Sequence, residues 1–243
     1  MAVKQRAIAS ADKEERRRAI LDAAEALFLE HPDRMASVAE VAEAAGLAKG
    51  TVYLYFPGKE EMLLALHERH VAEFFAQLMK KLAEPGPLGF DDILPVTSAY
   101  LIRMPGYLGL TSRCFGMMER EIPVPAALAF KARVTQALVA AGAGLERHFP
   151  ALAPGDGLQL LLHSYGLIVG LWQLLHPNER FGRAMDRPEL RPLKRDYEKD
   201  IEQALRSLWS GAMAQARKPV AVAQPKASGS VAPLKKHSVR SSR

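Results

Sequence analysis

The 243-residue sequence predicts an all-α protein, on the strength of three observations. Apolar residues recur three and four positions apart through most of the chain, which is helical spacing. No segment shows a convincing alternation of apolar and polar residues, the pattern of a half-buried strand. Turns that contain Pro or Gly divide the chain into segments of helical length. We therefore expect a set of helices joined by short connections.

The first helix carries an apolar stripe and is expected to end near His31 and Pro32. Its stripe consists of Ile20, Ala23, Ala24, Leu27 and Phe28. Ser37 and Glu40 then form a capping-box sequence, in which each side chain bonds to the backbone amide of the other residue. This box predicts a short helix from Val38 to Ala45. Gly46 is expected to end that helix because glycine readily adopts a positive φ.

Another short helix is expected after Leu47, running to about Tyr55, and Pro57 and Gly58 end it. A long helix follows from Lys59 to about Glu84. Its stripe consists of Val71, Phe74, Phe75, Leu78, Met79 and Leu82. Later helices are expected at 91–104, 106–119, 125–148, 157–176 and 189–214. Residues 217–243 are rich in Pro, Ser, Ala and Lys without periodicity, so they are expected to be disordered.

Charge gives no support for nucleic-acid binding by the folded part of the chain. The formal net charge is +6, but residues 217–243 contain seven Lys or Arg and no Asp or Glu. Without that tail, 26 basic residues face 27 acidic ones, and the first 70 residues hold ten basic against twelve acidic groups. The basic tail can add only unspecific attraction to a polyanion. A DNA-binding function must therefore rest on a motif.

The cysteine count and the hydropathy of the chain narrow the choice of cellular compartment. Cys114 is the single cysteine, which excludes an intramolecular disulfide and fits a reducing compartment. The N-terminus has no apolar run long enough for a signal peptide. The segment 157–175 is the one membrane-like stretch, but Gln159, His163, Ser164 and Gln173 interrupt it. A buried helix of a cytoplasmic protein is favoured over a membrane span.

The stretch AGLAKGTVYLYFPGKEEM, residues 45–62, decides between two kinds of phosphate site. A nucleotide-binding loop requires G-x-x-x-x-G-K-[ST] after a strand, whereas Gly58-Lys59 is followed by Glu60 and no strand precedes it. A helix-turn-helix fits better, with Ala42 as the small residue where the helices cross and Gly46 in the turn. The N-terminal residues of the second helix then face base edges in the major groove.

The order of these residues resembles that of the TetR-type transcriptional regulators. The matching segments lie between Arg18 and Leu63, about a fifth of the chain: AAEALF at 23–28, VAEVA at 38–42, AGL at 45–47, KGTVY at 49–53 and YFPGKE at 55–60. The resemblance implies an all-helical homodimer with an N-terminal DNA-binding domain and a C-terminal domain for ligand binding and dimerisation. We place these domains at 13–58 and 59–216, followed by the basic tail at 217–243.

The resemblance also implies roles for individual residues of the motif. Lys49, Gly50, Thr51 and Tyr53 are expected to read bases and backbone, and Tyr55 and Lys59 to hold phosphates. Tyr53 and Tyr55 lie about 200° apart around a helix, so they cannot face one surface, while Val52 and Phe56 are expected in the core. The chain departs from the family pattern at Ala48 and Gly58, which lack side-chain caps. An alanine at a helix N-cap costs about 1 kcal/mol.

The C-terminal region is expected to hold an apolar or aromatic small-molecule effector between its helices. The candidate lining residues are Tyr100, Met104, Tyr107, Leu108, Cys114, Phe115, Met118 and Trp172. Helices 157–176 and 189–214 are expected to form the dimer interface, where Gly166 and Gly170 allow close approach. Cys114 is expected to be an inert buried thiol, with a sensor role as the less favoured alternative.

Nothing in the sequence predicts an enzyme, a cofactor or a metal. The chain has no G-x-S-x-G elbow, and His67 and His70 have no third ligand candidate nearby. The sequence therefore favours a ligand-responsive repressor that binds a palindromic DNA operator as a homodimer. A helical DNA-binding adaptor controlled by a protein partner stays open as the alternative. A filled core in 88–216 would favour the adaptor, and an apolar cavity there would favour the repressor.

Overall fold

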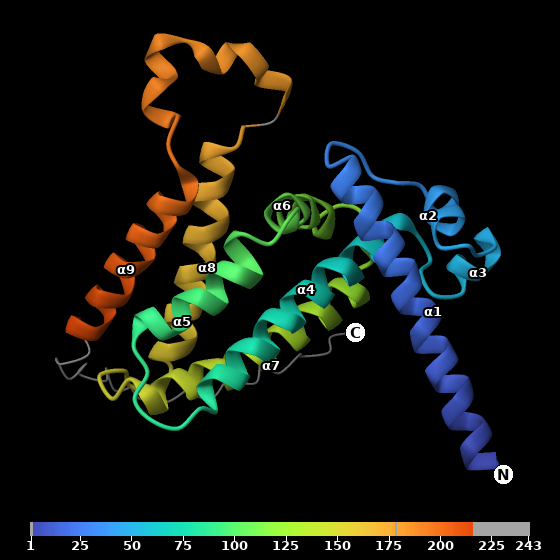
Figure 1. The fold of residues 1–243 in the computed structure, drawn as a ribbon, viewed down its shortest axis with the longest axis horizontal. Coiled ribbons are helices and arrows are strands. Elements are labelled where there is room, and N and C mark those ends of the chain that lie inside the picture. Colours follow the sequence, from blue (N-terminus) through green and yellow to red (C-terminus); the bar gives the residue numbers. More distant parts are fainter. Residues whose placement is uncertain (1, 178, 216–243) are drawn as a thin grey trace, which may run out of the picture.

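The computed structural model describes residues 2–177 and 179–215, and it is helical throughout the elements that it defines. The predicted disorder and attraction of the basic tail concern residues that lie outside this range. Figure 1 shows α1–α3 at one end of the molecule and α8 and α9 at the other, with α4 and α7 running between them. The all-α fold class is confirmed.

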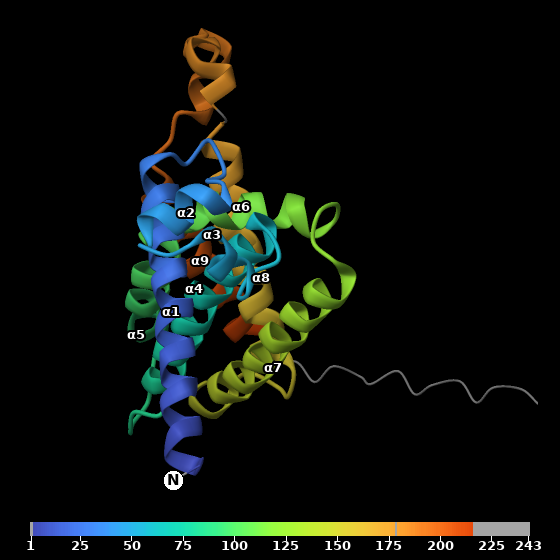
Figure 2. The same cartoon turned by 90° about the vertical axis from the view of Figure 1, so that its right-hand side faces the viewer.

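The N-terminal end consists of α1 (Ala2–Glu30), α2 (Val38–Ala44) and α3 (Lys49–Tyr53). The capping box is present as predicted, since the Glu40 amide donates to Ser37 Oγ at 3.3 Å and the Ser37 amide donates to Glu40 Oε2 at 2.8 Å. Figures 1 and 2 show that the N-terminal turns of α1 stand clear of the rest of the chain. Val52 and Phe56 are buried, as predicted.

The C-terminal part contains α4 (Lys59–Leu82), α5 (Phe90–Thr97), α6 (Tyr107–Met118) and α7 (Val124–His148). The helix predicted at 91–104 is divided, because α5 ends at Thr97 and a π-helix, η1, spans Ser98–Ile102. Pro95 lies inside α5 and has no amide hydrogen to donate. Beyond it the hydrogen bonds widen to five residues, as the Arg103 amide donates to the Ser98 carbonyl at 2.8 Å.

Two further α-helices, α8 (Asp156–Leu175) and α9 (Tyr197–Gln215), pack against each other. The prediction of one helix over 189–214 was wrong at its N-terminal end. Two 3-10 helices, η2 (Glu179–Asp186) and η3 (Pro188–Leu193), precede α9 and project beyond the ends of α8 and α9 in Figure 1. Pro192 within η3 cannot donate a backbone hydrogen bond, which prevents an α-helix from continuing through it.

The buried apolar residues form two clusters, and α4 contributes to both. Its first turns place Met62, Leu63 and Leu66 in a cluster with α1, α2, α3 and α6. Its later turns place Phe74 and Leu78 in the cluster of the C-terminal helices. A movement of α4 therefore disturbs both cores. The domain boundary between residues 58 and 59 stays a prediction, because α4 belongs to the packing of both parts.

Candidate nucleic-acid interface and ligand cavity

The turn between α2 and α3 has the geometry of a helix-turn-helix. Gly46 adopts φ = 65°, the left-handed conformation that favours glycine. The Leu47 amide donates to the Ala42 carbonyl at 2.8 Å, which closes the turn, and Ala42 is buried where the helices cross. These contacts hold α3 against α2 and fix the direction in which α3 presents its exposed face.

The predicted DNA-reading residues of α3 face solvent. Lys49, Gly50 and Tyr53 are exposed and Thr51 is half-buried. The Lys49 ammonium lies 5.9 Å from the centroid of the Tyr53 ring, within the range of a cation–π contact. A Cβ atom on Gly50 would meet no atom within 4 Å, so the approach to its backbone is open. The exposed face of α3 can therefore approach a groove with its backbone as well as its side chains.

Tyr55 and Lys59 occupy different surroundings from the residues of α3. Tyr55 is half-buried and packs against the N-terminal core, as the angular separation from Tyr53 predicts. The Lys59 ammonium lies 3.8 Å from Glu60 Oε1, and Glu61 also stands in the first turn of α4. Ala48 and Gly58 are N-caps without side-chain hydrogen bonds, as expected. A phosphate here must compete with the Glu60 carboxylate for Lys59.

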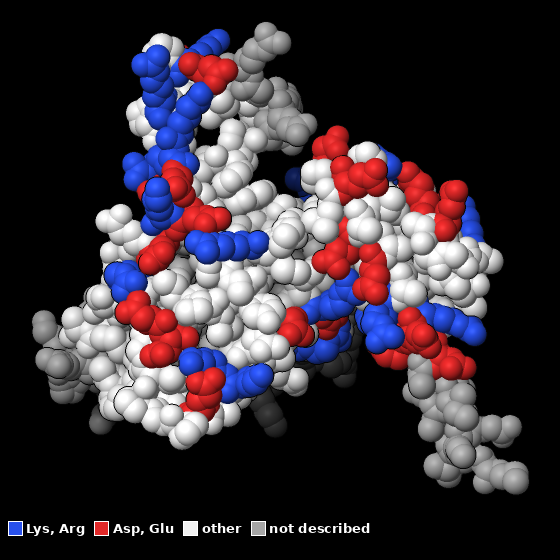
Figure 3. Space-filling model, viewed as in Figure 1, with Lys and Arg blue, Asp and Glu red and all other residues white. Residues whose placement is uncertain are grey.

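One exposed residue of this end was missed by sequence reasoning. Leu54, directly after α3, is 82% exposed although it is apolar. An apolar side chain beside a reading helix can contact a thymine methyl group in the major groove. The signal available in the sequence is that Leu54 follows Tyr53 and lies outside the apolar stripe formed by Val52 and Phe56. The charges in this region are mixed. Figure 3 shows basic and acidic side chains interspersed over α1–α3 on the face in view.

A cavity of about 120 Å³ lies among the C-terminal helices. Its lining residues come from α4 to α9 and are almost all apolar: His67, Val71, Phe74, Phe75, Phe90, Ile93, Leu94, Thr97, Leu101, Tyr107, Phe115, Phe130, Val134, Leu138, Leu161, Leu162, Ser164, Tyr165, Ile168, Leu205 and Trp209. Sequence reasoning missed most of them. Their apolar spacing was visible, but spacing does not distinguish a cavity wall from a filled core.

The predicted ligand-binding residues are divided among several places. Tyr107 and Phe115 line the cavity. Met104, Leu108 and Trp172 line a second, more open hollow, which also contains Arg113. Tyr100, Cys114 and Met118 line neither of these two hollows. All eight assignments stay predictions.

Cys114 is fully buried, and its Sγ donates a weak hydrogen bond to the Leu63 carbonyl at 3.7 Å. Burial raises the pKa of this thiol to about 12, so it is protonated at neutral pH. The burial of Cys114 and the raised pKa of its thiol both indicate that this cysteine is unreactive. In the described part of the chain, no group of three or more His, Cys, Asp or Glu side chains is arranged to hold a metal ion.

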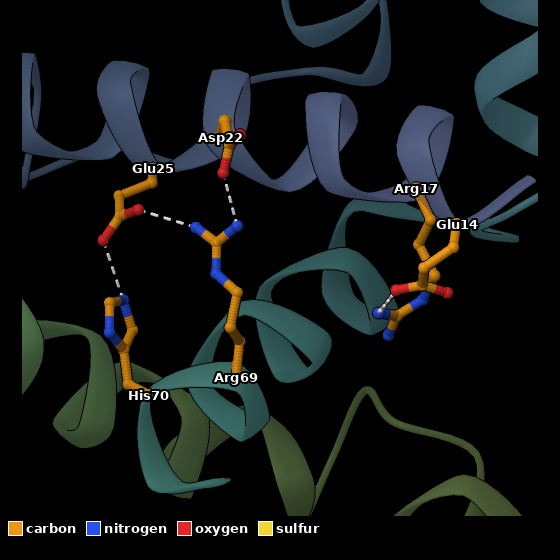
Figure 4. Close-up of polar contacts among 6 residues, drawn as sticks. All are labelled: Glu14, Arg17, Asp22, Glu25, Arg69 and His70. Carbon is orange, nitrogen blue, oxygen red and sulfur yellow. Dashed lines mark hydrogen bonds and ion pairs between the residues drawn. The ribbon is translucent and has the colours of Figure 1, made fainter. Parts of the chain in front are cut away.

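A group of charged residues joins α4 to α1 (Figure 4). The Arg69 guanidinium donates to Asp22 Oδ1 at 2.5 Å and to Glu25 Oε2 at 2.6 Å. His70 Nε2 lies 2.9 Å from Glu25 Oε1. Burial lowers the pKa of His70, and the neighbouring Glu25 carboxylate opposes that shift. We call these four residues the α1–α4 tie.

Tyr107 connects this tie to the cavity. Its ring stacks on that of His67 with centroids 5.7 Å apart, and it meets His70 edge-on at 6.0 Å. His67 lines the cavity, whereas His70 belongs to the tie. Both histidines are on α4, less than one turn apart. A displacement of either ring by a molecule in the cavity therefore acts on the contacts between α4 and α1.

α8 has the length and apolar composition of a membrane span, the only described helix that does. One of its faces packs against α7 and α9, which is also the behaviour of a core helix. The opposite face is a stripe that includes the exposed Leu162, Gly166, Leu167 and Leu174 and the half-buried Gly170. We call this the α8 stripe. It leaves apolar surface uncovered in a single chain.

Comparison with known proteins places this chain in a class defined by the same two parts. A family model described as bacterial regulatory proteins, tetR family, matches residues 20–66. A second, described as tetracyclin repressor-like, C-terminal domain, matches residues 68–216, more than half of the chain. The chain therefore belongs to the TetR family of transcriptional regulators, which confirms the resemblance at residues 18–63.

The curated relatives are similar to this chain over a short stretch. The fatty acid metabolism regulator protein of Bacillus subtilis is 34% identical over 65 residues, which cover 27% of this chain and 34% of that protein. The transcriptional repressor LfrR of Mycolicibacterium smegmatis is 44% identical over 64 residues, covering 26% and 32%. The matched stretch thus spans about a third of each relative.

Solved structures share the fold over most of the chain. The fatty acid degradation regulator FadR of Bacillus halodurans has a TM-score of 0.53 and 19% identity, covering 81% of this chain and 95% of that one. A TetR-family regulator of Streptomyces coelicolor has a TM-score of 0.51 and 23% identity, covering 83% and 99%. At these identities the likeness concerns the fold alone.

Proposed function

We propose that this protein is a cytoplasmic, ligand-responsive repressor that binds a palindromic DNA operator as a homodimer. The observation that carries the proposal is the combination of an exposed reading face on α3 with an apolar cavity lined by α4, whose first turns share a buried cluster with α3. Lys49, Gly50, Thr51 and Tyr53 are assigned to the major groove, and Tyr55 and Lys59 to phosphates. One helix then connects the two binding events.

The mechanism follows from the packing of α4. An effector in the cavity contacts the later turns of α4, whose first turns belong to the core of the DNA-binding end. The α1–α4 tie carries a shift of α4 to α1 and so to α3. In a dimer the two α3 helices must lie about 34–36 Å apart, or a multiple of this, to enter successive major grooves. An effector that binds more tightly to a dimer with a different separation of the two α3 helices releases the operator.

The cavity also bears on the alternative of an adaptor controlled by a protein partner. An adaptor of this fold needs no internal space, whereas an apolar cavity of this kind suits a small molecule. The space among the C-terminal helices thus favours the ligand-responsive repressor. No observation on the described surface points to a protein partner of another kind.

The proposal is tested by selecting bound sequences from random duplex DNA with the purified full chain. A two-fold symmetric consensus is the expected result, and compounds are then screened for release of that duplex. Selected sequences without symmetry would contradict binding by a dimer. A symmetric operator that no small molecule releases, but that a protein from the source cell does, would favour the adaptor.

A further inference from the structure

The face of α1 that packs into the N-terminal core changes character towards the start of the helix. Ile20 and Ala24 are buried on this face. Arg17 lies three residues before Ile20, and Lys13 lies four residues before Arg17, so both continue the same face. Figures 1 and 2 show that this end of α1 runs past α3 and away from the other helices. The face is therefore apolar within the core and basic where the helix leaves it.

Arg17 lies at the turn between α3 and α4. Its guanidinium carbon is 5.6 Å from the centroid of the Phe56 ring, within the range of a cation–π contact. Phe56 is buried, Tyr55 directly precedes it, and Lys59 begins α4 three positions after it. Tyr55 and Lys59 are the residues to which we assign phosphates. Arg17 is thus close to the proposed phosphate site, although it belongs to another helix.

The contacts of Arg17 order its guanidinium but leave it accessible. Its ion pair with Glu14 Oε1 is 3.9 Å long, and the two residues lie beside each other on α1 in Figure 4. The Glu14 side chain is 75% exposed, so a pair of this length contributes little stability. The Arg17 side chain is itself 38% exposed. Its guanidinium can therefore donate to a phosphate without the loss of a strong contact.

The charges on this part of α1 are separated by sign. Lys13 is exposed and one turn from Arg17, a spacing at which Cβ atoms are about 5–6 Å apart. Glu15 lies about 200° around the helix from each of them. A second cation near Lys59 also offsets the Glu60 carboxylate, which lies 3.8 Å from Lys59 Nζ. A row of cations on one face suits the repeated phosphates of a duplex.

We propose that Lys13 and Arg17 bind phosphates of the operator beside the base pairs that α3 reads, and so extend the phosphate contacts of Tyr55 and Lys59 along α1. This inference rests on the proposed function, in which α3 enters the major groove. Phosphate contacts fix the register and orientation of a protein on DNA without reading its sequence. Lys13 and Arg17 precede residue 20, where the match to the tetR family model begins, so that comparison assigns them no role.

The test measures how salt weakens the complex of the full chain with the selected operator. Each neutralised phosphate contributes about 0.9 to the steepness of log K against log salt concentration. Arg17→Met removes the charge but keeps apolar cover over Phe56. In a dimer it should reduce the steepness by about 1.8, so between 50 and 200 mM salt the variant loses about 12-fold less affinity than the wild type. Lys13→Met should have the same effect.

Two further variants separate phosphate binding from net charge and from packing. Arg18→Met removes the same charge from the next position of α1, but Arg18 is exposed about 100° around the helix from Arg17. It should leave the steepness unchanged, and an equal reduction in Arg17→Met and Arg18→Met would overturn the proposal. Arg17→Lys keeps the charge and should keep the steepness. A loss as large as that of Arg17→Met would assign Arg17 to packing on Phe56 instead.

Single phosphates replaced by uncharged methylphosphonates locate the contact on the operator. At the phosphate that Arg17 binds, the replacement should weaken binding of the wild type and leave Arg17→Met unaffected, because the two changes remove one interaction. A tight operator complex in which no phosphate distinguishes the two proteins would overturn this inference alone. A wild-type chain that binds no duplex would instead overturn the proposed function, and this inference with it.

Discussion

At the scale of single residues, the reading face of α3 depends on how Lys49 and Tyr53 support each other. The ammonium lies over the tyrosine ring, so each side chain restricts the other before any DNA is present. Such ordering lowers the entropy that must be lost on binding. The two residues are therefore expected to act together in selecting bases, beyond a general attraction to phosphate.

We predict that Lys49→Ala weakens binding to the selected operator by about 1–3 kcal/mol and binding to random duplex much less. The reason is the loss of a contact to a base edge. The operator presents that base edge at the right position, whereas most random sequences do not. Fluorescence anisotropy at several salt concentrations measures both affinities. Lys131→Ala, which removes an exposed lysine of α7, is the control and should change neither. Equal losses on both duplexes would make Lys49 a phosphate contact only.

His67 also predicts how stability depends on pH. In the unfolded chain an imidazole titrates near 6.5, whereas burial lowers the folded pKa of His67 to about 4. Between these values the unfolded chain binds a proton that the folded one does not. The free energy of unfolding therefore falls as the pH decreases from 6.5 to about 4 and levels off below. This residue accounts for roughly 3 kcal/mol of that loss.

The variant His67→Gln should be less sensitive to pH in that interval, because glutamine does not titrate. Urea unfolding at pH 7, 6, 5 and 4 measures the difference between the two proteins. His70 titrates nearby and its pKa is lowered too, so the comparison is made with His70 present in both. Parallel pH profiles of wild type and variant would mean that the folded protein protonates His67 as easily as the unfolded chain.

At the scale of elements, the crossing of α7 and α8 requires two glycines. A Cβ atom on Gly142 would lie 2.5 Å from the Leu158 backbone nitrogen, and one on Gly157 would lie 2.2 Å from the Gly142 carbonyl oxygen. Backbone atoms cannot move aside as the end of a flexible side chain can. These two helices both line the cavity, so their close approach also determines its width.

We predict that Gly157→Ala lowers the free energy of unfolding by about 1–3 kcal/mol, the usual cost of overpacking. Gly116→Ala is the matched control, because a Cβ atom on this exposed glycine of α6 meets nothing within 4 Å. That variant should be as stable as the wild type or more stable by up to about 1 kcal/mol, from helix propensity. Chemical denaturation decides, and a fully stable Gly157→Ala would refute the close crossing.

At the scale of the whole molecule, the α8 stripe is an apolar surface that a single chain leaves uncovered. Leu167 is 36% exposed and Leu174 is 67% exposed, beside Gly166 and Gly170, where an added Cβ atom meets nothing within the chain. Glycines on an exposed face allow a second helix to approach closely. The stripe therefore supports the predicted dimer interface, and it gives the helix a reason to be apolar outside a membrane.

Leu167→Arg tests this assignment directly. The wild-type chain is expected to sediment as a dimer and the variant as a monomer at micromolar concentration, because an arginine there would be buried without a partner. Leu128→Arg serves as the control, since Leu128 is 60% exposed on α7 and lies outside the stripe. Should Leu167→Arg remain dimeric while folded, the interface must lie on another face.

Local sequence determined the DNA-binding end of this protein. The capping box, the left-handed Gly46 and the missing caps at Ala48 and Gly58 each involve residues within a few positions of one another. Such contacts form between neighbours in the chain, so residue types and spacing are enough to predict them. The family resemblance added the roles of residues on α3, which spacing alone does not provide.

Only the tertiary structure decided what the C-terminal helices enclose. The cavity brings together His67, Ser164 and Trp209 from α4, α8 and α9, and Thr111 of α6 holds the His67 ring through its Nε2. The α1–α4 tie likewise joins Asp22 to Arg69 across 47 positions. An apolar stripe predicts that a helix face is covered. Which residues cover it, and whether they leave a space, depends on the packing of all the helices together.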